Sequence, residues 1–325
     1  MNSGTLDEID QRLMQELQRD GRAPFTRLAA AVGVSEHTVA RRYRRLHTMG
    51  LRILGVPGRH PAGATRWLLR VSCTPDASAT IAEALARRPD TAWVSIASGG
   101  TELHCAFATR TTGERDALLL HKLPQTPQVV SVSAYCLLHA FEGASDAWHI
   151  PVREHQGDED QATTPPAPPQ TPAADAGLDA VDEQLMAELA KDGRATVSEL
   201  ARATDRSPAS ITRRLDHLRS TAALRLAVDF IPEHLGYQMQ VRFWLRVAPG
   251  QLGTVGTALA AHPEIPFAAV TTGPSNLIVT GLFRDTGELY HYLDHRIGIL
   301  PGVQSIETTP ILREVKRLTY PTAAR

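Results

Sequence analysis

The chain carries one sequence pattern twice. Residues 6–46 match residues 178–218 at 18 of 41 positions with a constant offset of 172 residues, and the similarity continues more weakly beyond them. Solenoid and propeller proteins repeat every ~20–50 residues, so this period is too long for them. It indicates that a whole folding unit was duplicated, and the fold predicted for one copy is therefore predicted for the other.

A segment between the copies, residues 153–177, has the composition of a linker. Its acidic run, residues 158–160, is followed by five prolines. Such a composition cannot bury a core, and the prolines favour extended conformations. An extended chain spans roughly 3 Å per residue, so the length of this segment does not determine how the two copies are placed.

The composition is that of an ordinary globular protein. Of 325 residues, 42% are hydrophobic and 21% charged, and the formal net charge is −1, so any charge that binds nucleic acid must be concentrated locally. No apolar stretch is long enough to cross a bilayer, and the N-terminal residues do not resemble a signal peptide. The three cysteines, Cys73, Cys105 and Cys136, are expected to be buried strand residues, which favours a reducing cytoplasm.

The first part of each copy has the pattern of three short helices. In the first copy, Asp7 can cap a helix that presents Ile9, Leu13 and Leu17 on one face and ends at Gly21. A second short helix and a third one follow, joined by a turn that contains a glycine. Two helices joined in this way form a helix-turn-helix.

The second copy repeats this pattern with one difference in the turn. Gly33 lies in the turn of the first copy, and Asp205 replaces it in the second. Aspartate tolerates left-handed backbone better than most residues, so the turn is predicted there as well. The third helix begins at Ser35 in one copy and at Ser207 in the other, where Pro208 suits the first helical position.

Positive charge is concentrated on the third helices. Residues 35–52 contain five arginines against one glutamate, and residues 206–225 contain five arginines against one aspartate, a local net charge of +4 in each case. This places charge on the helix that would enter a major groove. The residues predicted to contact DNA are Ser35, His37, Thr38, Arg41, Arg42, Arg45, Ser207, Ser210, Thr212, Arg213 and Arg214.

Two other interpretations of these arginines remain open. A solvated basic face on a helical domain would have the same composition, although the arginine pair recurs at the same place in both copies. Arg42 and Arg214 are also candidates for a structural role, because acids such as Asp10 or Asp20 are within reach. Arg41 and Arg213 are therefore the stronger candidates for DNA contact.

The remainder of each copy predicts a small α+β domain. Its elements follow the order strand–helix–strand–strand–helix–strand of a ferredoxin-like fold. They span residues 67–73, 76–87, 92–98, 102–109, 113–122 and 129–139 in the first copy, and 239–247, 252–261, 267–272, 277–283, 287–296 and 303–312 in the second. Helices would cover one face of such a sheet, so the other face is expected to pair with another copy.

These patterns together resemble the Lrp/AsnC family of bacterial and archaeal regulators. The resemblance rests on Leu6-Asp7-x-x-Asp10, Leu17-x-x-Asp20-Gly21-Arg22, Leu28-Ala29, Ser35-x-x-Thr38-Val39-x-Arg41-Arg42 and Leu46-x-x-x-Gly50, and in the second copy on Leu178-Asp179, Asp182, Asp192-Gly193-Arg194 and Ser207-x-x-Ser210-Ile211-x-Arg213-Arg214. It implies a plain or winged helix-turn-helix followed by a ligand-sensing α+β domain (RAM/ACT-like) that dimerises. One such unit per chain is usual, so this chain resembles a fused pair.

The sequence therefore predicts an α+β protein with five segments. Helix-turn-helix domains are expected at residues 1–53 and 178–227, ferredoxin-like sensor domains at 64–145 and 237–318, and the linker at 153–177. The resemblance implies a cytoplasmic transcriptional regulator that binds double-stranded operator DNA, responds to a small-molecule effector such as an amino acid, and forms homo-oligomers through the sensor domains. We expect no membrane association, no cofactor, no metal and no catalytic residue.

The resemblance also implies an effector site at the turn between the central sensor strands, where the family commonly has Gly-x-x-Asp. Here the turns end in Glu102, which keeps the negative charge on a longer stem, and in Asn276, which loses it. The effector therefore need not be a free α-amino acid, at least in the second copy. The implied contacts, which are turn residues only in the alternative interpretation, are Gly99, Thr101, Glu102, Thr272, Gly273, Ser275 and Asn276.

Enzymatic alternatives have little support from motifs, since the sequence lacks a P-loop, a GxGxxG and a GxSxG motif. His291 and His295 have the i,i+4 spacing of a metal pair, but surface histidines are expected without a third ligand. His104, inside a strand, is expected to be a core or interface residue. The sirohaem decarboxylases, which resemble the same family as paired or fused units, are one alternative, and the arginine-rich helices argue against it. A metabolite sensor without DNA binding is another.

Overall fold

The structure is a computed structural model that describes residues 6–58, 64–109, 111–141, 178–318 and 320–322. The chain divides into two compact units, one formed by residues 1–60 and 145–237 and the other by residues 61–144 and 238–325. Each unit therefore combines one part of the first copy with the matching part of the second. The predicted linker, residues 153–177, lies outside the described residues. Among the described helices, none is both long enough and apolar enough to cross a membrane.

The first unit contains the two helix-turn-helix domains. Their helices are α1 (Glu8–Arg19), α2 (Phe25–Val32) and α3 (Glu36–Thr48) in the first copy, and α6 (Ala180–Leu189), α7 (Val197–Thr204) and α8 (Pro208–Ser220) in the second. Asp7 and Asp179 begin the first helix of each copy, and each forms a capping box with an aspartate three residues later. The predicted pattern of three helices is confirmed in both copies.

The turn before the third helix has left-handed backbone in both copies. The φ angle is 77° at Gly33 and 52° at Asp205. Aspartate occupies this region more readily than a bulky or branched residue, because its short polar side chain can bond locally. The turn therefore forms in the second copy despite the change of residue, as predicted.

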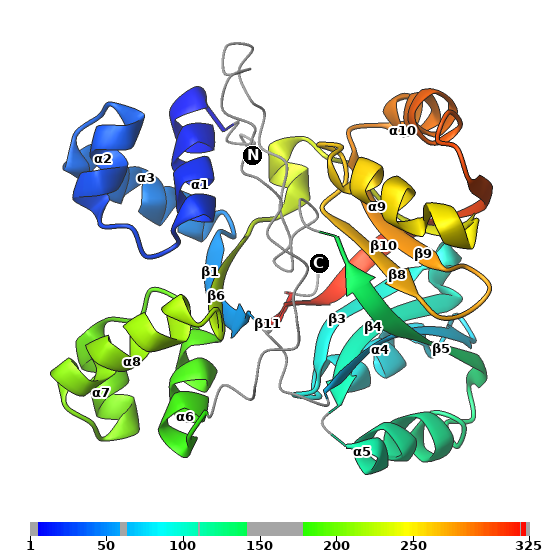
Figure 1. Cartoon of the computed structure of the whole chain (residues 1–325), viewed down its shortest axis with the longest axis horizontal. Coiled ribbons are helices and arrows are strands. Elements are labelled where there is room, and N and C mark those ends of the chain that lie inside the picture. The colour runs from blue at the N-terminus through cyan, green and yellow to red at the C-terminus, as the bar shows by residue number, and fades with distance from the viewer. Residues whose placement is uncertain (1–5, 59–63, 110, 142–177, 319, 323–325) are drawn as a thin grey trace. The chain divides into compact units, whose positions relative to one another are not determined.

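The two helix-turn-helix domains share an antiparallel strand pair that the sequence did not reveal. Strand β1 (Arg52–Pro57) follows α3, strand β6 (Leu224–Asp229) follows α8, and the two pair along their full length. Figure 1 shows this pair between the two groups of helices. A wing would require a hairpin within one domain, whereas each of these strands pairs across the copies. Because the partner of each strand is remote in sequence, no local pattern pointed to it.

The second unit contains the two α+β domains that were predicted to be sensors, called the sensor domains below. The first copy contributes β2 (Thr65–Cys73), α4 (Ser78–Ala86), β3 (Thr91–Ala97), β4 (Glu102–Thr109), α5 (Thr112–Asp116) and β5 (Val129–Ala140); the second contributes β7 (Met239–Val247), α9 (Leu252–Ala260), β8 (Phe267–Thr271), β9 (Leu277–Phe283), α10 (Thr286–Tyr292), β10 (Val303–Arg317) and the short β11 (Tyr320–Pro321). Helices α5 and α10 continue as π-helical segments, at Ala117–Lys122 and Leu293–Ile297. The predicted element order is confirmed, and the main difference is that β10 extends beyond its predicted end at residue 312.

The sensor strands of both copies belong to one antiparallel sheet in the described residues. The strand order is β3-β4-β2-β5 in the first copy and β8-β9-β7-β10 in the second. Because β5 pairs with β8, and β10 pairs with both β3 and β7, the sheet closes on itself like a barrel. Figure 1 shows the helices on its outer side. The sheet face that was predicted to need a partner copy is thus covered by the other sensor of the same chain.

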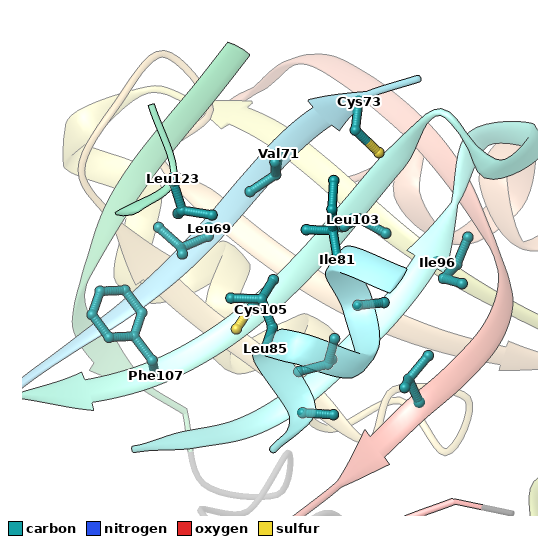
Figure 2. Packing of buried hydrophobic residues seen from close by; sticks show 14 of the residues in the cluster. Leu69, Val71, Cys73, Ile81, Leu85, Ile96, Leu103, Cys105, Phe107 and Leu123 are labelled. Carbon is teal, nitrogen blue, oxygen red and sulfur yellow. The ribbon is translucent and has the colours of Figure 1, made fainter. Parts of the chain in front are cut away.

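Apolar side chains pack between the helices and the sheet of each sensor. In the first copy, Ile81 and Leu85 of α4 pack with Leu69, Leu103 and Cys105 of the strands, and Figure 2 shows these side chains on the helix-covered face of the sheet. The second copy has a matching cluster between its own helices and strands. Alternate strand residues therefore face the helices, as the two-residue period of a strand requires.

The last strand of each sensor also completes the core of the other copy. The end of β5 pairs with β8, and Phe141, which follows it, packs in the apolar cluster of the second copy. The end of β10 pairs with β3, and Val315 packs in the cluster of the first copy. These pairings explain the additional length of β10, because its last residues are held by hydrogen bonds to the other copy.

Candidate DNA-binding surface and sensor interior

The third helices of the two helix-turn-helix domains, α3 and α8, begin in the same way. The Ser35 and Ser207 hydroxyls accept hydrogen bonds from the backbone N–H groups of Thr38 and Ser210, so each serine caps its helix. Four predicted contact residues therefore lie at helix starts. Unpaired backbone N–H groups and the positive end of the helix dipole favour phosphate there.

Exposed side chains follow on the outer face of each helix. His37 and Arg41 are exposed on α3, and Thr212 and Arg213 are exposed on α8. Arg44, which was not among the predicted contacts, is exposed on α3 as well. Its spacing of three residues from Arg41 was the signal for this position, because side chains at i and i+3 share one helix face.

The exposed faces of α3 and α8 differ in charge one turn beyond Arg41 and Arg213. Arg44 of α3 corresponds in the repeat to Asp216 of α8, and both side chains are exposed. Arginine attracts phosphate and can bond to guanine, whereas aspartate repels phosphate and can accept a hydrogen bond only from a base such as cytosine. The two faces therefore offer different chemistry at the same position of the helix.

Arg42, another predicted contact, holds α3 against α1. It donates to Asp7 at 2.7 Å and to Asp10 at 2.9 Å. Asp10 is fully buried and also forms an ion pair with Arg45, and removing either arginine would leave a buried acidic side chain with fewer partners. Burial raises the pKa of Asp7, but the hydrogen bonds from Arg42 and from the Asp10 backbone outweigh this effect and lower it.

Arg214 repeats this arrangement in the second copy. It donates to Asp179 at 2.8 Å and to Asp182 at 2.7 Å, and these hydrogen bonds raise the pKa of Arg214. The structure thus places Arg42 and Arg214 in the structural role that the sequence left open. Arg41 and Arg213 have no such ion pair among the described contacts and point to the outer face.

The predicted effector residues of the first sensor do not form one exposed group. Gly99, with a φ of 69°, occupies a backbone region that glycine adopts without strain, and the Thr101 hydroxyl donates to the Ser98 carbonyl at 2.7 Å. Both lie in the exposed turn between β3 and β4. Glu102 instead is buried, with 7% of its surface exposed, and it faces the interior of the barrel.

The matching turn of the second sensor is held by its own side chains. Asn276 accepts a hydrogen bond from the Val247 N–H at 2.9 Å and donates to the Val247 carbonyl at 2.8 Å. The Thr272 hydroxyl accepts from the backbone N–H of Cys136 at 2.9 Å. The Asn276 amide thus extends the pairing of β7 and β9, with its oxygen and its nitrogen each in one hydrogen bond to Val247. The other predicted residues of this turn are Gly273 and Ser275.

A partly buried ionic network joins the two sensors: Glu102 and His104 are buried, Arg70 is half-buried and Glu307 is exposed. Arg70 of β2 donates to Glu102 at 2.7 Å and to Glu307, on β10 of the other copy, at 2.9 Å. His104 Nε2 lies 2.7 Å from Glu102. The hydrogen bond to Glu307 is the main reason that the pKa of Arg70 is raised. Burial raises the pKa of Glu102, but the hydrogen bonds from His104 and Arg70 outweigh it and lower the pKa.

His104 confirms the expectation of a core or interface residue, but Arg70 and Glu307 were missed. The only signal for them was a charged residue on the alternate positions of a strand. Such a charge is predicted to face solvent as long as the closure of the sheet is unknown. Closure brings the half-buried Arg70 beside the other copy, where it pairs with the buried Glu102 and with the exposed Glu307, because a charge taken out of water is stable only with a partner.

The interior holds polar atoms with spare hydrogen-bonding capacity beside an apolar cluster that contains Trp244 and Ile278. His104 Nδ1, Arg242 Nε and Trp244 Nε1 are buried without a hydrogen-bond partner among the described residues. The Trp244 ring packs edge-on to His104 with centroids 5.2 Å apart, and the Arg70 guanidinium lies 4.9 Å from the Trp244 centroid. Burial lowers the pKa of Arg242 to about 10, so it stays charged at neutral pH.

Buried His104 should make the protein less stable in mild acid. Burial lowers its pKa to about 4, whereas an unfolded chain has a histidine pKa of ~6.5. Between these values the unfolded chain binds a proton that the folded chain does not, so stability falls as the pH falls below ~6.5. Between pH 7 and pH 5 the loss from this residue amounts to about 2 kcal/mol.

Urea unfolding at pH 7 and pH 5 measures this effect against a His104→Gln variant, which keeps an N–H donor for Glu102 but does not titrate. The free energy of unfolding of the wild type should fall by about 2 kcal/mol more than that of the variant. Equal losses for both proteins would show that His104 is not held neutral by its surroundings.

The other chemistry-bearing residues have structural surroundings. Cys73, Cys105 and Cys136 are free thiols, and burial raises the pKa of each, which makes them poor nucleophiles. His291 and His295 stack on each other with centroids 4.1 Å apart. Within the described ranges, no cluster of three or more potential metal-ligating side chains occurs.

A helix-turn-helix family model matches both copies of the repeat, and a ligand-binding family model matches the second copy. The AsnC-type helix-turn-helix domain matches residues 6–47 and 178–219, and the Lrp/AsnC ligand binding domain matches residues 240–321. The HTH-type transcriptional regulator FL11 of Pyrococcus horikoshii is 32% identical over 143 residues, which are 44% of this chain and 94% of that protein. The regulatory protein AsnC of Haemophilus influenzae is 26% identical over 146 residues, 43% of this chain and 97% of that protein.

A solved structure extends the likeness over both copies. The crystal structure of the siroheme decarboxylase NirDL matches with a TM-score of 0.63 and covers 96% of this chain and 93% of that one. The sequences are 14% identical, so this likeness concerns the fold alone. The matched domains and the regulator that is aligned over nearly its full length show that the chain belongs to the Lrp/AsnC family and carries its helix-turn-helix domain twice.

Proposed function

We propose that this chain is a sequence-specific DNA-binding transcriptional regulator whose DNA binding responds to a small molecule. The observation that carries the proposal is the matched pair Arg41 and Arg213, which are exposed at the same position of two recognition helices. A helix-turn-helix places such side chains at base edges in the major groove. Membership of the family, and relatives named as transcriptional regulators, support the same function.

The surrounding residues would position the protein on the DNA backbone. Helix starts and hydroxyl groups are suited to phosphate, whereas the arginines one turn later reach base edges. Arg45 takes a minor part, because it also pairs with Asp10. The proposed contacts are Ser35, His37, Thr38, Arg41, Arg44, Arg45, Ser207, Ser210, Thr212 and Arg213.

The two copies should prefer different half-sites. His37 corresponds to Ala209 and Arg44 corresponds to Asp216, so neither the size nor the charge of the reading face is conserved between the copies. An operator that satisfies both helices is an imperfect palindrome. The copy with Asp216 should contribute the smaller share of the affinity, because its aspartate repels phosphate.

The sensor pair is the proposed effector-responsive part. We assign one ferredoxin-like βαββαβ sensor, derived by duplication, to residues 64–145 and one to residues 237–318. Glu102 and Asn276 are engaged by protein groups, so an amino acid or related compound at these turns would be bound chiefly by backbone groups and by the Thr101 and Ser275 hydroxyls. Further association of chains through the sensors, and a cytoplasmic location beside the DNA, fit this function.

Selection of binding sites from a random DNA library, followed by titration at two salt concentrations with and without a panel of amino acids, tests the proposed function. We expect recovery of asymmetric sites, affinity that falls steeply with salt, and a shift caused by at least one ligand class. Perfectly symmetric sites would contradict the difference between the helices. Absence of DNA binding at low salt, together with a Soret band from a bound tetrapyrrole, would instead favour the decarboxylase alternative.

A further inference from the structure

The Asp-Gly-Arg sequence, which stands once in each copy, forms a reciprocal contact between the two helix-turn-helix domains. Arg22 of the first copy donates to the carbonyls of Gly193 and Ala195 in the second copy, at 2.7 and 2.8 Å. Arg194 of the second copy donates to the carbonyls of Gly21 and Ala23 in the first, at 2.7 and 3.0 Å. Each arginine therefore binds the turn that carries the other arginine.

Glycine is needed in this contact because the two backbones approach closely. The N–H of Gly193 donates to the Ile53 carbonyl of β1 at 2.7 Å. A Cβ atom on Gly193 would lie 2.9 Å from that carbonyl oxygen, and one on Gly21 would lie 2.9 Å from the Ile53 side chain. The glycine and the arginine of the motif therefore both serve this interface.

The same two turns also contact the recognition helix of the opposite copy. The Arg194 guanidinium lies 5.0 Å from the ring centroid of Phe25 on α2 and 5.3 Å from that of Tyr43 on α3. In return, Arg219 of α8 donates to Asp20 at 3.1 Å. Each recognition helix is therefore held by its own domain and by the turn of the other one.

The guanidinium groups of Arg22 and Arg194 are both engaged in this contact. Burial lowers the pKa of Arg22, and the nearby charge of Arg194 acts in the same direction. Burying a positive charge beside another one costs free energy. The planar guanidinium group offsets this cost because it donates to two carbonyl acceptors at once. A lysine would keep the charge but could not bridge both carbonyls or stack in the same way.

We propose that Arg22 and Arg194 are positioning residues for DNA recognition, which set the spacing and relative orientation of α3 and α8. This rests on the proposed function, since a fixed spacing matters only if both helices bind one DNA molecule. Half-sites one helical turn, ~34 Å, apart are read together only when the two helices keep a defined separation. Arg194 has the larger effect of the two, because it alone stacks on a recognition helix.

The test compares the full-length wild type with Arg194→Lys and Arg22→Lys on selected DNA sites. Three DNA fragments are needed: the selected full site, the same site with a few base pairs inserted between its halves, and a single half-site. The wild type should bind the inserted site at least about tenfold more weakly than the full site, and Arg194→Lys should lose most of this difference through weaker binding of the full site. Arg22→Lys should show a smaller change in the same direction.

The half-site and a control variant separate positioning from folding and from the function itself. Arg19→Lys is the matched control, because Arg19 is exposed and pairs only with Glu16 in its own helix among the described contacts. Half-site binding should be the same for the wild type and all variants. An unchanged spacing preference in Arg194→Lys would overturn the positioning role, and so would an equal loss on all three fragments. Failure of the wild type to bind any fragment would overturn the proposed function instead.

Discussion

Replacing Arg41 and Arg213 together by alanine should abolish specific binding to the operator. Each side chain, if it contacts a base, contributes on the order of 1–3 kcal/mol. The two residues lie on different helices and share no partner among the described contacts, so their effects should add to about 2–6 kcal/mol. A fluorescence anisotropy titration with the selected operator and with unrelated DNA measures the change. Affinity for unrelated DNA should fall far less than affinity for the operator.

Two controls separate the loss of a DNA contact from a general loss of charge and from misfolding. Arg19→Ala removes one exposed positive charge from the same unit without touching the recognition helices, and should leave operator affinity nearly unchanged. Thermal melts should show that Arg41→Ala and Arg213→Ala fold as the wild type does, because neither side chain supports the domain interior as Arg42 and Arg214 do. Wild-type affinity in the double variant would refute the assignment of these residues to DNA contact.

Replacing Phe141 by alanine should destabilise the sensor unit by about 3–5 kcal/mol. The Phe141 ring is buried among apolar residues of the second copy, although the residue belongs to the first copy by sequence. A Cβ atom on Gly256 would lie 2.0 Å from this ring, so the ring fills space that the glycine leaves free. Its removal therefore creates a cavity in the core of the other copy.

Urea unfolding of the full chain measures this loss. Leu138→Ala is the matched control, since Leu138 lies on β5, just before Phe141, but is 61% exposed, and surface substitutions of this kind change stability by less than ~0.5 kcal/mol. A small effect of Phe141→Ala would mean that the first copy does not complete the core of the second in solution. The pairing of the sensors within one barrel would then be wrong.

Features with a local cause were predictable from the sequence. Helix starts at Asp7 and Ser35 follow from capping by short polar side chains, and the turn at Asp205 follows from backbone preference. The strand and helix order of the sensors followed from periods of two and 3.6 residues. Because the pattern is duplicated, each of these inferences could be drawn from both copies. The exposed arginines Arg41 and Arg213 were found because they occupy matching positions in the two copies.

Features that depend on residues far apart in the sequence were decided only by the tertiary structure. The pairing of β1 with β6, the closure of the sensor sheet and the reciprocal contacts of Arg22 and Arg194 all join one copy to the other. Closure buries Glu102 and partly buries Arg70, because a strand face that looks solvated by its charge becomes an interior once the strands of the other copy cover it. The sequence by itself thus determined two copies, their elements and a basic reading face. Which face was buried, and which polar groups hold the copies together, depended on packing between segments that have no local signal for one another.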